Sequence, residues 1–239
     1  MWSIPGIVVL AALASSAPAG RGRTGGGLVS SDSSTAALPG GGTSPLDLFP
    51  RRSPVAFVEN LGQWEGPVRF AARRPDGSNL YLTPDSLWLQ LSRREVDASM
   101  EGPARGGADL DGPERTVGAN LRLRFEGSRE EVRLAGREPT PTLFHYFVGN
   151  DPRRWRTGVP GFGRVAYEGL YEGVDLLVRE EGTVLEYDLV LSPGANLAGV
   201  VVRVEGAEGP LRLDAEGGLL IDTVLGAVRQ PRPQAWEEE

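Results

Sequence analysis

The chain has 239 residues, of which 40% are hydrophobic, enough for one large domain or two small ones with a buried core. Its net charge of -7 argues against a sequence-independent nucleic-acid binder, which needs a basic face, so we predict no nucleic-acid partner. Every one of its 25 basic residues is arginine, which we interpret as genome base composition. The absence of cysteine excludes disulfides, thiolate metal ligands and cysteine nucleophiles.

The first 19 residues have the pattern of an export signal. An apolar run from Ile4 to Ala14 is followed by small residues that end in Ala17-Pro18-Ala19, an A-x-A cleavage pattern. The residues before the run include no arginine or lysine, which leaves open a true start further upstream or a buried helix instead of a signal. We predict a signal peptide over residues 1–19 and a secreted protein, either extracellular or at the cell surface. The run is shorter than the ~20 residues of a membrane-spanning helix, and no later stretch predicts a membrane span.

Residues 20–53 are rich in glycine and serine and almost free of aromatic residues, the composition of a flexible linker. We expect this N-terminal segment to be disordered. The folded domain is therefore predicted to occupy residues 54–239.

From Pro54 onward, short runs of alternating apolar and polar residues predict β-strands. The clearest run is 184–191, in which three leucines and a tyrosine share one face. Glycine and proline, 33 and 19 in the chain, recur too often for a long helix. The prediction is an all-β domain, a sandwich or open barrel of short, mainly antiparallel strands. Residues 96–118 lack alternation and are predicted to be a long surface loop. Further strands are predicted at 120–125, 200–204, 211–213 and 218–221, and turns at 75–77 and 214–218.

No motif indicates a catalytic, cofactor or metal site. Gly161–Ala166 matches G-x-G-x-x-A, but Pro160 precedes it and a β pattern follows, whereas a dinucleotide turn opens a helix. Asp109–Glu114 begins like a calcium loop without completing the pattern, so we interpret it as a solvated acidic loop. His145, the single histidine, is interpreted as structural. We predict no catalytic residue, no cofactor and no metal.

The stretch Tyr146–Pro160 combines turn residues with clustered arginines and a tryptophan. The favoured interpretation is a latch, in which Trp155 covers the edge of the sheet and the arginines solvate it. The alternative is a patch for a ligand or partner, since tryptophan and arginine are enriched in binding hot spots. The candidate residues for either role are Asp151, Arg153, Arg154, Trp155 and Arg156.

A carbohydrate-directed module is a second possibility. Such a module binds sugars through exposed aromatic rings, here Trp64, Trp88 and Trp155, or hydrolyses them with a pair of carboxylates. Outward-facing acids on strands are more often solvated or paired with arginine. The candidate acids are Glu172, Asp175, Glu186 and Asp188.

Five segments in order carry a family resemblance: Phe57–Trp64, Tyr146–Pro160, Tyr171–Leu176, Leu185–Leu189 and Val190–Ala195. Together they resemble the uncharacterised domain at the N-terminus of bacterial SBBP-repeat proteins, which are secreted and β-propeller-like. The resemblance covers residues 54–236. It implies a non-enzymatic structural or interaction module whose partners are a downstream repeat region or other surface proteins. Members of that family usually continue beyond the equivalent of Glu239, so we expect a truncated reading frame or a short paralogue.

Overall fold

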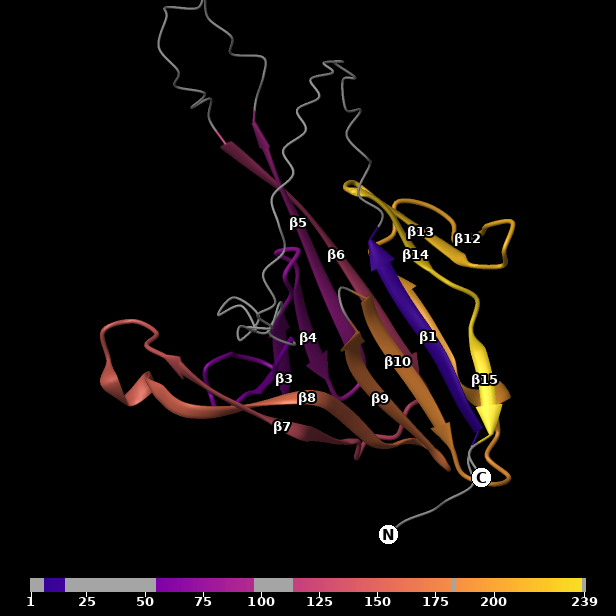
Figure 1. Cartoon of the computed structure of the whole chain (residues 1–239), viewed down its shortest axis with the longest axis horizontal. Coiled ribbons are helices and arrows are strands. Elements are labelled where there is room, and N and C mark those ends of the chain that lie inside the picture. Colours follow the sequence, from indigo (N-terminus) through magenta and orange to yellow (C-terminus); the bar gives the residue numbers. More distant parts are fainter. Residues whose placement is uncertain (1–6, 16–54, 97–113, 182–183, 238–239) are drawn as a thin grey trace, which may run out of the picture. The chain divides into compact units, whose positions relative to one another are not determined.

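Antiparallel strands form nearly all of the regular structure, as Figure 1 shows. The computed structural model describes residues 7–15, 55–96, 114–181 and 184–237. In chain order the strands are β1 (Ile7–Ser15), β2 (Phe57–Glu59), β3 (Phe70–Arg73), β4 (Asn79–Thr83), β5 (Ser86–Val96), β6 (Glu114–Glu126), β7 (Arg133–Tyr146), β8 (Arg156–Tyr171), β9 (Val174–Glu181), β10 (Val184–Leu191), β11 (Val201–Glu205), β12 (Arg212–Leu213), β13 (Leu219–Thr223), β14 (Gly226–Gln230) and β15 (Gln234–Glu237). Two short 3-10 turns, η3 (Pro152–Arg154) and η4 (Leu197–Gly199), lie between strands.

The strands join in the order β11-β6-β5-β4-β3-β2-β8-β9-β10-β1-β14-β13-β12, with β7 paired to β8 and β15 paired to β1. This antiparallel sheet curls into a half-barrel. The all-β prediction is therefore confirmed. Among the described residues, no helix is long and apolar enough to cross a membrane.

The core lies on one face of the curled sheet and follows the alternation seen in the sequence. In β10, Leu185, Tyr187, Leu189 and Leu191 are buried, as the period-two pattern predicts. Tyr167 of β8 is fully buried, and its hydroxyl donates to the Ser86 carbonyl oxygen across 3.2 Å. Each large apolar side chain buried in this way contributes about 1.5–3 kcal/mol.

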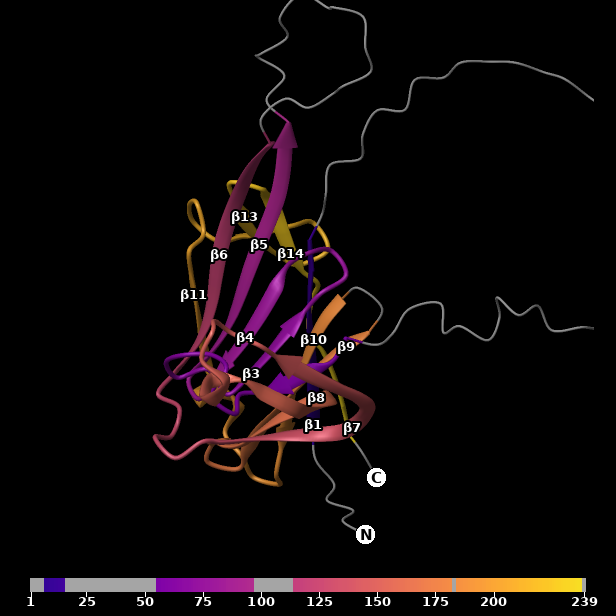
Figure 2. The ribbon, with the colours of Figure 1, turned by 90° about the vertical axis from the view of Figure 1, so that its left-hand side faces the viewer.

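The predicted surface loop at 96–118 is wrong at its C-terminal end. β5 extends to Val96 and β6 begins at Glu114, and the two strands pair in register from Val96↔Glu114 inward. Residues 97–113, including the acidic segment interpreted as a solvated loop, lie outside the described residues. The paired ends form a long hairpin that rises beyond the neighbouring strands, as Figure 2 shows. Arg93, Arg94 and Thr116 are exposed there. A ribbon with no buried face does not need hydrophobic alternation, so the pattern gave no strand signal.

Both predicted turns are confirmed. Asp76 accepts a hydrogen bond from the Ser78 amide at 2.9 Å in the β3–β4 turn, and Gly77 there has φ +85°. In the β12–β13 turn, Asp214 accepts from the amides of Glu216 and Gly218 at 3.0 and 2.7 Å. Short polar side chains at these positions satisfy the amides of the turn, which explains why the sequence located them.

Part of the apolar N-terminal segment, Ile7–Ser15, forms the strand β1, so the alternative of a buried helix is wrong. β1 pairs with β10 from Ile7↔Leu191 to Leu13↔Leu185, and on its other side with β15 and β14. The signal peptide and its cleavage after Ala19 stay predictions. The predicted linker, residues 20–53, lies outside the described residues.

Candidate functional site

The hairpin of β7 and β8 carries the stretch that the sequence singled out. Figure 1 shows its connecting loop at the left of the view, at the end of the hairpin far from β9. The two strands pair with register shifts between Pro139 and Leu143 and between Phe144 and Tyr146. After Tyr146 the chain turns through Gly149, at φ +69°, and through η3 before β8 begins. The turn residues of this stretch thus reverse the chain between β7 and β8.

Asp151 shapes this loop. Its side chain caps η3 by accepting from the Arg153 amide at 3.1 Å, and Pro152 occupies the first turn. The Arg153 guanidinium donates to both carboxylate oxygens, at 3.0 to 3.2 Å. The side-chain hydrogen bond from Arg153 is the main cause that lowers the pKa of Asp151, and the charge of exposed Arg154 adds to it. The loop therefore holds its own ion pair.

Trp155 packs within the loop. Its indole N–H donates to the Gly149 carbonyl oxygen at 3.1 Å, and its ring meets Phe147 edge to face at 5.3 Å between centroids. Phe147 in turn stacks on His145 at 6.4 Å. Trp155 and Phe147 nevertheless stay 39% and 62% exposed. The exposed apolar residues at this end of the hairpin, here called the tip patch, are Leu143, Phe147, Val148 and Trp155.

Arg156 connects the hairpin loop to the β2–β3 loop. Its Nε donates to the Leu61 carbonyl oxygen at 2.6 Å, while Nη1 donates to the carbonyl oxygens of Arg153 and Trp155 at 2.9 and 3.0 Å. The neighbouring Gly62 has φ +102°, and a Cβ there would lie 2.9 Å from Arg156 Nη2. Glycine is therefore needed for this close approach.

Of the five candidates, Asp151 and Arg153 form a pair within the loop and Arg156 bridges to a second loop, whereas Arg154 and Trp155 are exposed. The latch interpretation for Trp155 stays a prediction. Sequence reasoning missed Phe147, although it follows Phe144, His145 and Tyr146 in an apolar run directly before the turn.

Three of the four candidate acids make contacts within the sheet, and the fourth is exposed in a turn. Glu186 and Asp188 both bind Arg179, at 2.9 and 3.1 Å. Burial raises the pKa of Asp188, and the charge of Arg179 opposes this. Asp175 accepts a 2.6 Å hydrogen bond from the Gly169 amide, and Glu172 is exposed in the β8–β9 turn. This arrangement is typical of acids that hold a sheet together.

Two of the three candidate sugar-binding rings are half-buried. Trp64 meets Tyr146 edge to face at 5.2 Å, and Trp88 lies under the Arg122 guanidinium, 4.8 Å from its ring centroid. Only Trp155 of the three is exposed. The structure thus offers one of the predicted rings, not a platform of three.

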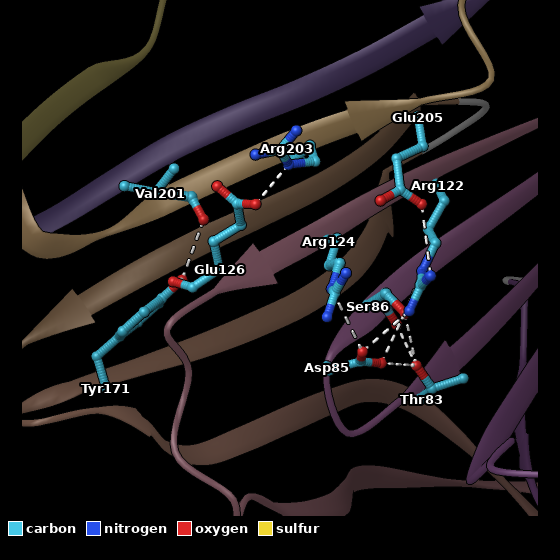
Figure 3. A network of polar contacts seen from close by, with 10 residues as sticks. All are labelled: Thr83, Asp85, Ser86, Arg122, Arg124, Glu126, Tyr171, Val201, Arg203 and Glu205. Carbon is cyan, nitrogen blue, oxygen red and sulfur yellow. Dashed lines mark hydrogen bonds and ion pairs between the residues drawn. The ribbon is translucent and has the colours of Figure 1, made fainter.

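A polar network around the β4–β5 turn was missed by the sequence analysis. Figure 3 shows Asp85 at its centre. Its carboxylate accepts from the hydroxyls of Thr83 and Ser86, each at 2.9 Å, and from Arg122 Nη2 at 2.9 Å. Arg122 also reaches Glu205 of β11 at 3.4 Å, so one guanidinium links three strands. The sequence feature that could have indicated this network is the L-R-L-R-F alternation of β6, because it places Arg122 and Arg124 on the face opposite the core.

These contacts change the acidity of Asp85. Burial raises its pKa, but the hydrogen bonds from Ser86 and Thr83 and the charges of Arg122 and Arg124 outweigh it, and the pKa is lowered. The same face continues to Glu126, which pairs with Arg203. From the core, the Tyr171 hydroxyl lies 3.1 Å from the backbone carbonyl oxygens of Glu126 and Val201. Within the described parts of the chain, no cluster of three acids or histidines is arranged to hold a metal ion. The hydrogen bonds and ion pairs of Arg122 connect β6 to the β4–β5 turn and to β11.

A family model described as a domain of unknown function, DUF7948, matches residues 57–239. The chain belongs to the DUF7948 family. No curated protein and no solved structure matches it. The DUF7948 match begins close to the predicted domain start at residue 54 and includes both the tip patch and the Asp85 network. It does not include β1, although β1 is paired into the sheet of the DUF7948 domain.

Proposed function

We propose that the chain is a secreted, non-enzymatic structural or interaction module that normally precedes β-propeller-type repeats in an extracellular or cell-surface protein. The export pattern of residues 1–19 and the ordered family motifs support the location. The tip patch carries the proposal of an interaction role. The downstream repeat region and other surface proteins are the proposed partners.

The tip patch has the chemistry of a contact surface. Two aromatic side chains pack against each other yet leave much of their area in water, and the same loop carries the exposed Arg153, which pairs with Asp151. Covering apolar area releases about 25 cal/mol per Å². Aromatic and arginine side chains dominate binding hot spots, and contiguous exposed apolar residues mark interaction sites.

The polar groups that resemble catalytic candidates already have structural partners. The carboxylates of Glu186 and Asp188 share one arginine, and His145 Nδ1 accepts the Gly158 amide at 3.3 Å. These contacts give Glu186, Asp188 and His145 structural roles in the sheet, which supports a non-enzymatic module.

A carbohydrate-directed module is the alternative. Trp155 alone of the predicted rings supports it, because Trp64 and Trp88 are engaged by Tyr146 and Arg122. Specific, saturable binding of the full chain on a glycan array would favour this alternative over the protein-contact role.

The proposal is tested by expressing the full chain in its host and measuring two quantities. The first is the N-terminus of the exported protein, expected at Gly20. The second is the fraction of exported chain that sediments with cells. We expect Phe147→Ser with Trp155→Ser to release the chain into the medium, and the control Leu213→Ser, at a residue 72% exposed in β12, to leave it in place. Equal sedimentation of both variants would contradict the contact role, and absence from the exported fraction would contradict secretion.

A further inference from the structure

β1 fills a gap between two parts of the sheet. On one side it pairs with β10 from Ile7↔Leu191 to Leu13↔Leu185. On the other side it pairs with β15 from Ile7↔Glu237 to Leu10↔Gln234, and then with β14 at Ala14↔Arg229 and Ser15↔Val228. We call the gap between β10 and the β14–β15 segment the strand slot. One nine-residue strand, antiparallel to both walls, satisfies its two edges.

Two of the three strands that line the slot, β10 and β14, are held by contacts in which β1 takes no part, whereas β15 pairs with β1 alone among the described strands. β10 pairs with β9 along its whole length, from Val184↔Glu181 to Leu191↔Val174. β14 pairs with β13, and the pair places Ile221 and Val228 in the main core at 0% and 1% exposure. The Tyr187 hydroxyl of β10 donates to Gln230 Oε1 of β14 at 2.9 Å, which joins the two walls directly.

A third contact fixes the far side of the β13–β14 hairpin. Arg93 of β5 donates through Nη1 to the Leu225 carbonyl oxygen at 3.3 Å, and the Glu208 amide donates to the Asp222 carbonyl oxygen at 2.8 Å. These bonds anchor the hairpin to the rest of the domain. The edges of β10 and β14 are therefore expected to keep their positions when β1 leaves, and β15 is expected to pair again when a new strand enters.

The strand in the slot lies outside the family match, whereas the strands that line the slot lie inside it. The family match covers residues 57–239, which include every wall of the slot but not β1. β1 also lies within the segment whose removal after Ala19 is part of the proposed function. Export with cleavage would leave the facing edges of β10 and β15 without a partner, and exposed edges are sites of strand addition.

We propose that the strand slot is an acceptor site for an extended aliphatic segment of another exported protein, and that β1 occupies it in the precursor. This inference rests on the proposed export. The sequence of β1, IVVLAALAS, indicates the occupant: about seven to nine residues without charge or proline, rich in branched and small aliphatic side chains. The occupant runs antiparallel to β10. A second copy of this chain is not the donor, because cleavage removes the same segment from every copy.

The test does not depend on export. A specific protease site is inserted between Ala19 and Gly20 of the full chain, which is folded first and cut afterwards. The probe is a fluorescein-labelled Ile7–Ser15 peptide with three added C-terminal arginines for solubility, and fluorescence anisotropy reports its binding. The matched control peptide carries Val9→Pro, which removes one backbone donor in the stretch where β1 is paired on both sides.

We expect the cut chain to exchange β1 for the probe with saturable binding, the uncut chain to bind none, and the proline peptide to bind about tenfold more weakly, as the loss of one backbone hydrogen bond implies. No binding to the cut chain, or equal binding of both peptides, would overturn the proposal. Unfolding of the domain once β1 leaves would make β1 an obligatory strand and would also overturn it. A dimer of the cut chain would make a second copy the occupant and overturn it. N-terminal sequencing of the exported protein decides the cleavage separately.

Discussion

Arg156 donates from Nε to the carbonyl oxygen of Leu61 across 2.6 Å, so the loop of the β7–β8 hairpin is fastened to the loop between β2 and β3. The same guanidinium holds two carbonyl oxygens of its own loop. The fastening contact of this stretch is therefore made by an arginine, while the adjacent Trp155 faces solvent with 39% of its area. The hydrogen bonds that join the two loops thus come from Arg156, and Trp155 contributes contacts within its own loop.

Replacing Arg156 with alanine is expected to lower the free energy of unfolding by about 1–2 kcal/mol, because three carbonyl oxygens lose a charged donor at a partly exposed site. Urea unfolding of the full chain measures the change. Arg154→Ala is the matched control, since Arg154 is exposed, and its effect is expected within about 0.5 kcal/mol. Equal losses of unfolding free energy in the two variants would show that Arg156 does not join the two loops.

Trp155→Ala is expected to lower the melting temperature less than Arg156→Ala does. The indole contributes one hydrogen bond to Gly149 and one edge-to-face contact with Phe147, both at an exposed position. Differential scanning calorimetry compares the variants. A larger loss of stability for Trp155→Ala would support the latch, in which this ring covers the edge of the sheet.

The sequence predicted the parts of the fold in which one face of a strand is buried. In β10 the alternation correctly marked Leu185, Tyr187 and Leu189 as core residues, but Asp188 on the opposite face is also buried, at 5% exposure, where it pairs with Arg179. The outer ends of β5 and β6 gave no such signal, because exposed ribbons are held by cross-strand pairing and not by burial. Local pattern also predicts turns, as at Gly77, because the short polar side chain and the glycine act within a few residues.

The sequence identified which residue types gather in the candidate site, but it predicted few of the contacts between them. Asp151 and Arg153 are two residues apart, and their pairing follows from the turn. Arg156 and Leu61 are 95 residues apart in the sequence. Their contact depends on the pairing of β2 with β8, and no local sequence pattern encodes that pairing. The meeting of Asp85 with Arg122 depends in the same way on the pairing of β5 with β6.

Asp85→Asn is expected to destabilise the protein at pH 7, by no more than about 1 kcal/mol, since the carboxylate is partly exposed and its ion pairs are screened. The pKa of Asp85 is lowered in the folded state, so its contribution is present above the ordinary value of 3.8 and is lost as the pH falls through the folded pKa. The difference between wild type and variant should therefore shrink below pH 3.8. Urea unfolding from pH 2.5 to 7 measures it, and a constant difference over that range would contradict the assignment.

Arg74→Met addresses the buried pair of Arg74 and Glu180, whose side chains are each 2% exposed. We expect a loss of about 3–5 kcal/mol at pH 7, because the carboxylate is left buried without its cation. Burial already raises the pKa of Glu180, and the charge of Arg74 lowers it. Removing Arg74 raises that pKa further.

For a carboxyl whose folded pKa lies above its ordinary 4.5, stability falls as the pH rises through the interval between the two values. Arg74→Met should therefore be least destabilised at pH 4 and most at pH 7. The double variant Arg74→Met with Glu180→Leu serves as the control and should regain much of the loss at pH 7. A pH-independent loss in the single variant would rule out the uncompensated carboxylate as its cause.

We propose that the exported chain contacts its partner through the tip patch. A photoreactive phenylalanine analogue in place of Phe147 tests this contact, in the chain exported by its own host, with the same analogue at Leu213 as the exposed control. We expect a discrete crosslinked product from position 147 that excess unlabelled chain suppresses, and none from position 213. Crosslinking that is equal at the two positions, or absent from position 147, would contradict it.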